Sequence, residues 1–466
     1  MDKYQVVIIG GGPGGYETAI RLSQYGINVA VLEANRIGGI CLNWGCIPTK
    51  ALVKTAELYN EIKELEAFGL PTLEMIPDYS KIYERKNKIV EQLVSGIEYL
   101  FRKRKIPVIN GKATTIRNED GHYIITTEAG NELSADHLIV ATGSSPKTLP
   151  GIEIDEQDIL SSTGILQLDQ LPESLAVIGG GVIGCEFASI FSTFGVDVQI
   201  IEFLPRIIAL EDEEISKRLS MAFKKSKIKL NTGVGVQSAQ KTPDGVELAL
   251  TDGSKVTVEK VLMSVGRAPN NNIDWQGMEL KSERGAIWID DMMRTSLPNV
   301  YAIGDVTAKL QLAHTASKQG LIVADLIDNA INNKSHHLEP LIYENIPRCT
   351  FTHPEIGSVG LSEKEAQDRY GEILTGRFPF TANGKAMAMS NTFGFVKTIA
   401  RADNGELVGM HIIGPQAAEL IAQGGILISL KCKIEQLEPI VFAHPTLSEA
   451  LKEALEDLRG LSIHKI

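Results

Sequence analysis

Two stretches of the chain share one pattern of apolar and polar positions. The first, VVIIGGGPGGYETAIRLSQYGINVAVLE, runs from Val6 to Glu33, and the second, LAVIGGGVIGCEFASIFSTFGVDVQIIE, runs from Leu175 to Glu202. In each, a short apolar run leads into a glycine turn, an amphipathic stretch follows, and a second apolar run ends at an acid. Short apolar runs bounded by turns indicate buried strands, and the amphipathic stretch indicates a helix. Each stretch is therefore predicted to be a strand–helix–strand unit.

The glycines of both units have the spacing of a dinucleotide-binding turn. They are Gly10, Gly12 and Gly15, followed by Glu33, and Gly179, Gly181 and Gly184, followed by Glu202. One glycine makes the tight turn, one lets the backbone approach a pyrophosphate, and one lets helix and strand pack closely. The helix N-terminus supplies N–H groups to the phosphates, and the acid accepts hydrogen bonds from a ribose. Because a carboxylate favours a free 2′-hydroxyl and repels a 2′-phosphate, Glu202 predicts NAD rather than NADP.

The composition is that of an ordinary globular protein. The chain has 466 residues, of which 43% are hydrophobic and 22% charged, so several domains are expected. Its net charge of −12 argues against nucleic acid or an anionic membrane as a partner. No apolar run has the length that spans a bilayer, and the start MDKYQVVIIG lacks the pattern of a secretory signal. We therefore expect a cytoplasmic protein with no nucleic-acid or membrane partner.

The stretch CLNWGCIPTK, residues 41–50, holds two of the five cysteines. Zinc takes about four ligands in closer groupings, and no second Cys/His cluster completes a site, so no metal is expected. Residues five apart on an ideal helix have Cα atoms roughly 8–9 Å apart, whereas a disulfide needs about 4.4–6.8 Å. A bridge between Cys41 and Cys46 thus requires a distorted segment, which Gly45 allows, and a strained local bridge is easily reduced. From the residues alone, two ordinary buried thiols remain an alternative.

The segment GGICLNWGCIPTK closely resembles the redox-active disulfide segment of the flavin-dependent pyridine nucleotide–disulfide oxidoreductases. Further motifs resemble the same family in the same order. They are DHLIVATGSSP at 136–146, VGRAPN at 265–270, TSLPNVYAIGD at 295–305 and HPTLSE near the C-terminus. The resemblance covers essentially the whole chain, and within the family it is greatest to the branch that oxidises dihydrolipoamide.

The resemblance implies an α/β fold with two Rossmann-like domains, for FAD and NAD, and a C-terminal α+β dimerisation domain. The implied boundaries are 1–146 and 267–338 for a discontinuous FAD domain, 147–266 for the NAD domain and 339–466 for the dimerisation domain. The implied assembly is a two-fold homodimer with shared sites. The other implied partner is a lipoyl-carrying protein, such as the E2 component of a 2-oxoacid dehydrogenase complex.

The resemblance also gives roles to single residues. Cys46 would face the flavin, and Cys41 would exchange with the substrate. The implied FAD contacts are Gly10, Gly12, Gly15, Glu33, Lys50, Thr142, Gly143, Asp305 and Ala313. The implied NAD contacts are Gly179, Gly181, Gly184, Glu186, Glu202 and Gly266. Lys50 and Glu186 match positions that pair near the flavin's reactive nitrogen, although two unrelated surface charges would also explain them.

A catalytic base is expected because a dithiol attacks a disulfide only as the thiolate. His444 is the candidate, with Glu449 orienting its ring, and the resemblance implies that it acts on the other subunit's disulfide. A structural explanation competes with this one. Thr446 and Glu449 have the spacing of a capping box in front of an amphipathic helix. The presence of both cysteines favours catalysis.

The implied function is NAD-dependent, FAD-containing oxidation of protein-bound dihydrolipoamide to lipoamide through a Cys41–Cys46 disulfide. One alternative is another flavin disulfide reductase, for a small disulfide of the glutathione type; HPTLSE rather than HPTSSE, together with Glu202, argues against it. The other is a non-catalytic redox-sensing scaffold, which the complete cysteine, histidine and glutamate set disfavours. Three departures from the family pattern leave the lipoyl-carrying partner open: Ile40 in place of threonine, Trp44 in place of valine, and Val441-Phe442 before HPT.

Overall fold

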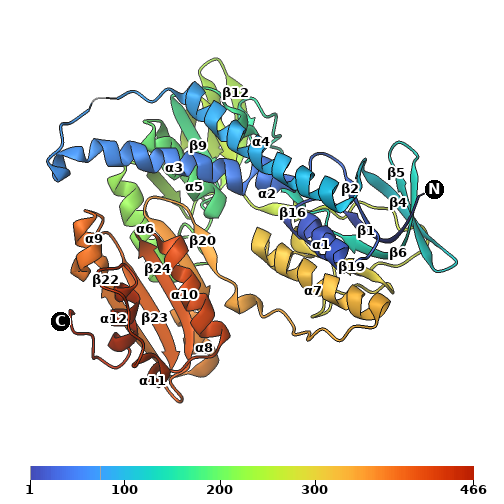
Figure 1. Ribbon diagram of the computed structural model, residues 1–466. Helices are drawn as coiled ribbons and strands as arrows, with labels where there is room; N and C mark the ends of the chain where they lie inside the picture. The colour runs from blue at the N-terminus through green and yellow to red at the C-terminus, as the bar shows by residue number, and fades with distance from the viewer. Residues whose placement is uncertain (1, 74, 466) are drawn as a thin grey trace. The chain divides into compact units, whose positions relative to one another are not determined.

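The computed structural model describes residues 2–73 and 75–465 (Figure 1). The chain divides into two compact units, each assembled from three segments. The first unit consists of Met1–Ala51, Tyr83–Lys147 and Gly266–Tyr343. The second consists of Leu52–Ile82, Thr148–Val265 and Glu344–Ile466. The three-domain division predicted from the sequence is finer than this one and stays a prediction.

The first unit is built on a seven-stranded sheet. Its parallel strands are β1 (Asp2–Ile9), β2 (Val29–Glu33), β3 (Val108–Asn110), β6 (Glu132–Val140) and β19 (Val300–Ala302), and β4 (Ala113–Glu119) and β5 (His122–Thr127) extend it in antiparallel fashion. The order is β3-β2-β1-β6-β5-β4, with β19 beside β6. The central strands are almost wholly apolar because both faces of a parallel sheet are covered.

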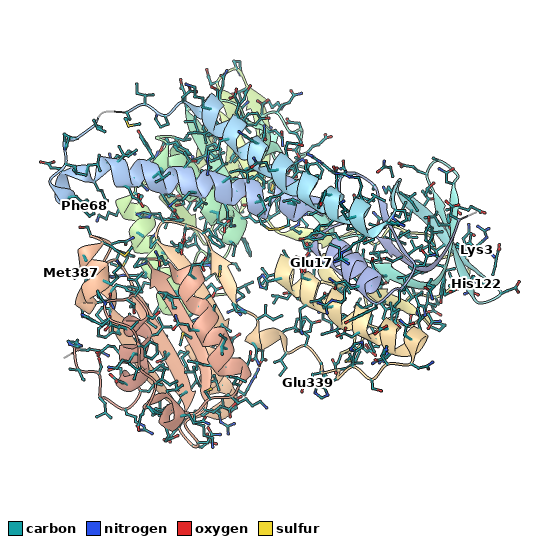
Figure 2. The ribbon with its side chains drawn as sticks, viewed as in Figure 1. Lys3, Glu17, Phe68, His122, Glu339 and Met387 are labelled. Atoms are coloured by element: carbon teal, nitrogen blue, oxygen red, sulfur yellow. A yellow bond between two sulfur atoms is a disulfide. The ribbon has the colours of Figure 1, made fainter. Side chains whose placement is uncertain are left out.

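The helices of the first unit come from several parts of the chain. They are α1 (Pro13–Gln24), α2 (Gly39–Trp44), the first turns of α3 (Cys46–Lys63), most of α4 (Tyr79–Arg104), and α7 (Ala313–Asn332). α1 and α7 lie side by side (Figure 1). Glu17 of α1 accepts a hydrogen bond of 2.9 Å from Ser317 of α7. Lys3 and His122 project on the side of the first unit where the chain begins (Figure 2).

The second unit contains another parallel sheet, with the order β11-β10-β9-β15-β8. Its strands are β8 (Ile159–Leu160), β9 (Ser174–Ile178), β10 (Asp197–Glu202), β11 (Lys229–Thr232) and β15 (Lys260–Met263). Helices α5 (Val182–Thr193) and α6 (Glu213–Lys225) follow β9 and β10. A smaller antiparallel sheet comprises β12 (Val236–Thr242), β13 (Gly245–Leu250) and β14 (Lys255–Val258).

The C-terminal part of the second unit is an antiparallel sheet with the order β20-β21-β24-β23-β22. Its strands are β20 (Arg348–Thr350), β21 (Glu355–Gly360), β22 (Ile373–Pro379), β23 (Phe395–Arg401) and β24 (Leu407–Gly414). Helix α10 (Ala417–Ser429) packs on β21 and β24, and α12 (Glu449–Asp457) packs on β22 and β23 (Figure 1). The shorter helices are α8 (Glu363–Tyr370), α9 (Gly384–Ala388) and α11 (Ile434–Leu437).

The predicted α/β class is confirmed, and both glycine-turn stretches fold as strand, helix and strand. The first gives β1, α1 and β2, and the second gives β9, α5 and β10. Two short strands, β7 (Ser144–Pro146) and β16 (Arg267–Pro269), pair where the chain leaves and re-enters the first unit. Within residues 2–73 and 75–465, no helix combines the length and the apolar character needed to cross a membrane.

Candidate active site

Two of the three glycines in each turn are required by the protein's own packing. A Cβ atom on Gly15 would stand 1.9 Å from the carbonyl oxygen of Gly10, and one on Gly184 would stand 2.1 Å from that of Gly179. Gly10 and Gly179 themselves have φ angles of 108° and 106°, which other residues rarely adopt. The fold therefore needs glycine at these four positions whether or not a ligand binds.

The middle glycine of each turn has no such requirement. A Cβ atom on Gly181 would meet no atom within 4 Å, and one on Gly12 only the Cα of Gly39 at 3.9 Å. Their φ angles of −75° and −67° suit any residue. Both residues are the N-caps of helices, α5 and α1, and a helix N-terminus binds anions. Room for a ligand, and not internal packing, explains these glycines, so both turns fit the pyrophosphate of a dinucleotide.

We expect Gly181→Asp to separate folding from nucleotide binding. Aspartate is a favoured N-cap residue, so the melting temperature should stay at or above that of the wild type. Its charge and bulk would lie where the pyrophosphate must approach, and the Kd for NAD should rise about a hundredfold. Thermal unfolding and NAD titration measure the two effects. The matched Gly12→Asp variant should lose FAD instead, and normal NAD binding by Gly181→Asp would exclude NAD from this turn.

The two acids that follow the turns are held in the same way. Glu33 accepts hydrogen bonds from the N–H groups of Gly11 (2.6 Å) and Asn35 (2.8 Å). Glu202 accepts them from Gly180 (2.5 Å) and Leu204 (2.7 Å). Each carboxylate oxygen has two lone pairs, so both acids keep acceptor capacity for a ribose. The structure thus places each acid at its own glycine turn.

Cys41 and Cys46 form a disulfide, with their Cα atoms 4.7 Å apart. The helical path is broken between them: α2 ends at Trp44, and α3 begins at Cys46. Gly45 makes the break, with φ −146° and ψ −113°. A Cβ there would stand 2.9 Å from the carbonyl oxygen of Ile40. This is the distortion that a bridge across five residues was expected to need.

Two residues that the sequence reasoning missed support this segment. The side-chain amide of Asn43, only 6% exposed, donates to the carbonyl oxygens of Ile37 (3.1 Å) and Gly39 (2.9 Å). The hydroxyl of Thr49 donates to the carbonyl oxygen of Gly45 at 2.6 Å. These three hydrogen bonds satisfy the carbonyls of Ile37 and Gly39 near the start of α2 and that of Gly45 at the helix break. The signal in the sequence is asparagine inside a short helix, where it is a poor helix former.

The predicted FAD residues of the crossing lie together in the first unit. Asp305 accepts a hydrogen bond of 2.5 Å from the buried hydroxyl of Ser144. Arg267 donates to the same hydroxyl at 2.7 Å and lies 3.9 Å from Asp305. Burial lowers the pKa of Arg267, and the charge of Asp305 opposes that shift. Arg267 was not predicted as a site residue, although it stands in VGRAPN.

Thr142, Gly143 and Gly266 shape the same crossing. The hydroxyl of Thr142 donates to the carbonyl oxygen of Asn270 at 2.6 Å, and the N–H of Asn270 donates to the carbonyl oxygen of Gly143 at 2.9 Å. Gly266 has a φ of 110° and accepts a hydrogen bond from the N–H of Lys147 at 3.0 Å. All three lie in the first unit. The NAD role predicted for Gly266 stays a prediction.

Ala313 is the first residue of α7, and no side chain caps that helix end. This N-terminal end is the positive end of the helix dipole, which favours a negatively charged ligand group. Lys50 lies on α3 in the first unit, and Glu186 lies on α5 in the second. Glu186 is 4% exposed and accepts a hydrogen bond from the N–H of Phe351 at 2.9 Å. The predicted pairing of Lys50 with Glu186 stays a prediction.

His444 and Glu449 contact each other directly in the second unit. The imidazole Nδ1 lies 2.9 Å from Glu449 Oε1, and the His444 side chain is 78% exposed. Burial raises the pKa of Glu449, but hydrogen bonds from the Thr446 N–H and from His444 outweigh it and lower that pKa. An ionised carboxylate only accepts hydrogen bonds, so Nδ1 carries a hydrogen, and Nε2 is the ring nitrogen left to exchange a proton. The pair is arranged as a base and its orienting group.

The expected capping box at this helix is only half correct. The N–H of Thr446 does donate to Glu449 Oε2, at 2.8 Å. The Thr446 hydroxyl, however, donates to the carbonyl oxygen of Ala443 at 2.8 Å. Helix α12 begins at Glu449, after Ser448. Thr446 is therefore no N-cap, because its hydroxyl serves the turn that positions His444.

Two of the sequence departures lie beside the disulfide, and one lies beside the histidine. Ile40 and Trp44 are half-buried residues of α2. Val441 is 93% exposed and stands three positions before His444. These departures leave the fit of a particular lipoyl carrier open.

Matches to two family models define the family of the chain. The family described as pyridine nucleotide-disulphide oxidoreductase matches residues 4–320, and the dimerisation domain of the same family matches residues 346–455. The first match alone covers more than half of the sequence. The chain belongs to the pyridine nucleotide-disulphide oxidoreductase family, as the motifs predicted, and it contains the family's dimerisation domain.

Named relatives are similar over nearly the whole chain. The chain is 39% identical to the dihydrolipoyl dehydrogenases of Zymomonas mobilis and Bacillus subtilis, in alignments of 471 and 476 residues. Each alignment covers 99% of this chain and 99% of the relative. The crystal structure of LpdA from Mycobacterium tuberculosis matches with a TM-score of 0.88 and 26% identity, over 98% of this chain and 100% of that one. The HOCl-induced flavoprotein disulfide reductase RclA from Escherichia coli matches with a TM-score of 0.84 and 26% identity, over 97% and 99%.

Proposed function

We propose that the chain is a dihydrolipoyl dehydrogenase, which oxidises dihydrolipoamide on a lipoyl-carrying protein and reduces NAD. The observation that carries this proposal is the Cys41–Cys46 disulfide at a helix break directly after a dinucleotide-binding unit. Curated relatives of that name share 39% of their residues with the chain over 99% of its length. No departure from the family pattern removes a cysteine, the histidine or its glutamate.

The two dinucleotides are FAD and NAD. Gly10, Gly12, Gly15 and Glu33 would hold the ADP half of FAD, with Thr142, Gly143, Asp305, Ala313 and Lys50 around the rest of it. Gly179, Gly181, Gly184 and Glu202 would hold NAD, with Glu186 and Gly266 nearby. When bound, FAD carries two electrons from the reduced cysteines to NAD as a hydride.

The cysteines perform the thiol exchange. A dihydrolipoamide thiolate attacks Cys41 Sγ, the Cys41–Cys46 bond breaks, and Cys46 leaves as a thiolate. The second thiolate of the substrate then displaces Cys41 from the mixed disulfide, so lipoamide leaves and two reduced cysteines remain. The substrate has lost two electrons and two protons. One proton is held at Nε2 of His444, and the other passes to the second cysteine or to solvent.

The proposed active unit is a homodimer. His444 and the disulfide belong to different units of the chain, and the His444 side chain is 78% exposed. We assign it to the disulfide of the partner subunit. The dimerisation domain exposes large apolar side chains that a partner would cover, among them Met387, which projects from α9 (Figure 2), Ile426 and Val441. The lipoyl carrier and the cytoplasmic location stay predictions.

A comparison of two substrate pairs tests the function. Dihydrolipoamide with NAD should give a kcat/KM far above that of glutathione disulfide with NADPH. A preference for glutathione disulfide would move the chain to the small-disulfide reductases. Binding of both nucleotides without turnover of either pair would favour a redox-sensing scaffold.

We expect Glu202→Gln to weaken the choice of NAD over NADP. The substitution removes the charge that repels a 2′-phosphate and a charge-assisted hydrogen bond to the ribose, so the ratio of kcat/KM for NAD to that for NADP should fall about tenfold or more. Steady-state kinetics with both nucleotides measure it. Glu173→Gln, at an exposed position directly before β9 of the same sheet, is the control and should leave the ratio unchanged. An unchanged ratio in Glu202→Gln would remove Glu202 from the ribose site.

A further inference from the structure

A row of polar and charged side chains crosses the C-terminal antiparallel sheet. Its members are directly opposed on neighbouring strands: Arg348 on β20, Ser358 on β21, His411 on β24, Lys397 on β23 and Arg377 on β22. Opposed residues project from the same face of a sheet. We call these five residues the polar row. They face the acidic start of α6 and the first residue of α8, on the side away from α10 and α12.

Lys397 is the centre of the polar row, and its side chain is 1% exposed. Its ammonium lies 2.9 Å from both carboxylate oxygens of Asp212, 2.9 Å from Glu214 and 2.7 Å from Glu363. Burial alone would lower the pKa of Lys397 and raise that of Asp212, but their mutual contacts and those to neighbouring groups reverse both shifts. Both groups are therefore charged at neutral pH. Removing Lys397 would leave the buried Asp212 carboxylate without its basic partner, whereas Lys397 would keep Glu214 and Glu363 if Asp212 were neutralised.

The neighbouring members of the row hold the acids on either side. Arg348 donates to Glu211 Oε1 at 3.2 Å. Arg377 donates through Nε to both carboxylate oxygens of Glu214, at 3.1 and 3.0 Å. Glu211, Asp212 and Glu214 are thus each bound by a basic side chain of the C-terminal sheet. The start of α6 and the two residues before it are therefore fixed at three points.

The loop that leads into α6, residues 203–211, contacts the second dinucleotide-binding turn. It follows Glu202 directly, and the N–H of Leu204 donates to the Glu202 carboxylate at 2.7 Å. Further along, the N–H of Ile208 donates to the carbonyl oxygen of Gly180 at 2.7 Å. Gly180 in turn donates its N–H to Glu202. The loop of residues 203–211 therefore contacts both the glycine turn and the ribose acid.

Ile208 needs support from its surroundings. Its φ is 40°, a region that β-branched residues avoid, and it is 3% exposed. Such backbone strain persists only where neighbouring contacts hold it. The N–H of Glu211 donates to the carbonyl oxygen of Ile208 at 2.9 Å, and Arg206 donates to the carbonyl oxygen of Glu211 at 3.0 Å. The strained residue is thus joined to the first acid that the polar row binds.

We propose that the polar row is a positioning device for the NAD site, an inference that rests on the proposed function. The row fixes the acids at 211–214, and these fix the 203–211 loop against the glycine turn. Ile208 then stays bonded to Gly180, and Glu202 keeps its orientation toward the ribose. The C-terminal domain, which carries His444 for the thiol chemistry, in this way also sets the affinity for the nucleotide.

Asp212→Asn is the sharpest test of this proposal. Aspartate 212 caps α6 by accepting from the N–H of Glu214, and asparagine caps a helix equally well. The substitution can keep the cap oxygen while it removes the charge that faces Lys397. It also replaces Oδ2, which accepts from Lys397 and from the N–H of Glu363 at 3.1 Å, by an NH2 group. Lys397→Met removes the charge from the other side. Lys229→Met is the matched control, because it breaks an exposed pair with Asp197 in the parallel sheet of the same unit.

Nucleotide affinity is measured on purified, FAD-containing protein. The Kd and the KM for NAD should rise about tenfold in Asp212→Asn and in Lys397→Met. This is the effect expected when one charge-assisted hydrogen bond to the ribose is lost. FAD content, and the rate at which dihydrolipoamide reduces the protein without NAD, should stay at wild-type values, and Lys229→Met should change nothing. Should Lys397→Met fail to fold, Asp212→Asn decides alone.

Two other outcomes have distinct meanings. If Asp212→Asn binds NAD as the wild type does and only its melting temperature falls, the row merely joins two domains and the proposal is overturned. If the wild type itself binds no NAD, the proposed function fails, and this inference fails with it. The titration of the wild type separates these cases before any variant is made.

Discussion

Cys46→Ser should abolish dithiol oxidation and leave a folded, FAD-containing protein. Serine has nearly the shape of cysteine but forms no disulfide, so the electrons of dihydrolipoamide have no acceptor at Cys41. Loss of a member of a catalytic set that acts as a unit costs a factor on the order of 10⁴ or more in kcat. The measurement is NADH formation with dihydrolipoamide, beside the flavin absorbance of the same sample.

The remaining cysteines supply the control for this prediction. Cys185 is fully buried and burial raises the pKa of its thiol, while Cys349 and Cys432 are partly buried. Cys432→Ser should turn over as the wild type does. Substantial turnover by Cys46→Ser, with FAD bound, would refute the disulfide mechanism.

His444→Gln should produce the second largest loss. Glutamine keeps a hydrogen-bonding side chain but takes up no proton, and a missing general base costs about 10²–10⁴ in rate. FAD content and the disulfide should be unaffected, because the exposed histidine supports no buried structure. The deficit should shrink at high pH, where more of the substrate is already thiolate. If His444→Gln turned over at the wild-type rate at neutral pH, the role of the His444–Glu449 pair would be structural and not catalytic.

Glu449 should matter less than the histidine that it orients. Its lowered pKa means that its contacts with Thr446 and His444 contribute stability above the ordinary pKa of a glutamate, and that this contribution is lost as the pH falls through the lowered value. Glu449→Gln should therefore reduce kcat less than His444→Gln does, and it should flatten the acid limb of the stability profile. Thermal unfolding across acidic pH measures that limb.

The sequence predicted those parts of the site whose residues lie within one short segment of the chain. The two glycine turns and their acids lie within single strand–helix–strand units, so their spacing carries the geometry. The need for a broken helix between Cys41 and Cys46 followed from helix dimensions alone. Family resemblance supplied what spacing could not, namely the disulfide, the cofactors and the roles of His444 and Asp305.

Contacts between distant segments were invisible in the sequence. Arg267 contacts Ser144, 123 residues away, and Asp305, and Lys397 of β23 contacts Asp212 at the N-terminus of α6. Neither has a local pattern. The capping box failed for another reason: its sequence rule was satisfied, but the Thr446 hydroxyl found a nearer acceptor in the Ala443 carbonyl.

NADH formation from free dihydrolipoamide and NAD, followed under anaerobic conditions with the purified flavoprotein, tests the central claim most directly. The account predicts rapid turnover that requires both substrates and disappears in Cys46→Ser. No turnover by wild-type protein with FAD bound and the Cys41–Cys46 disulfide intact would contradict it. The same fold would then serve a different disulfide.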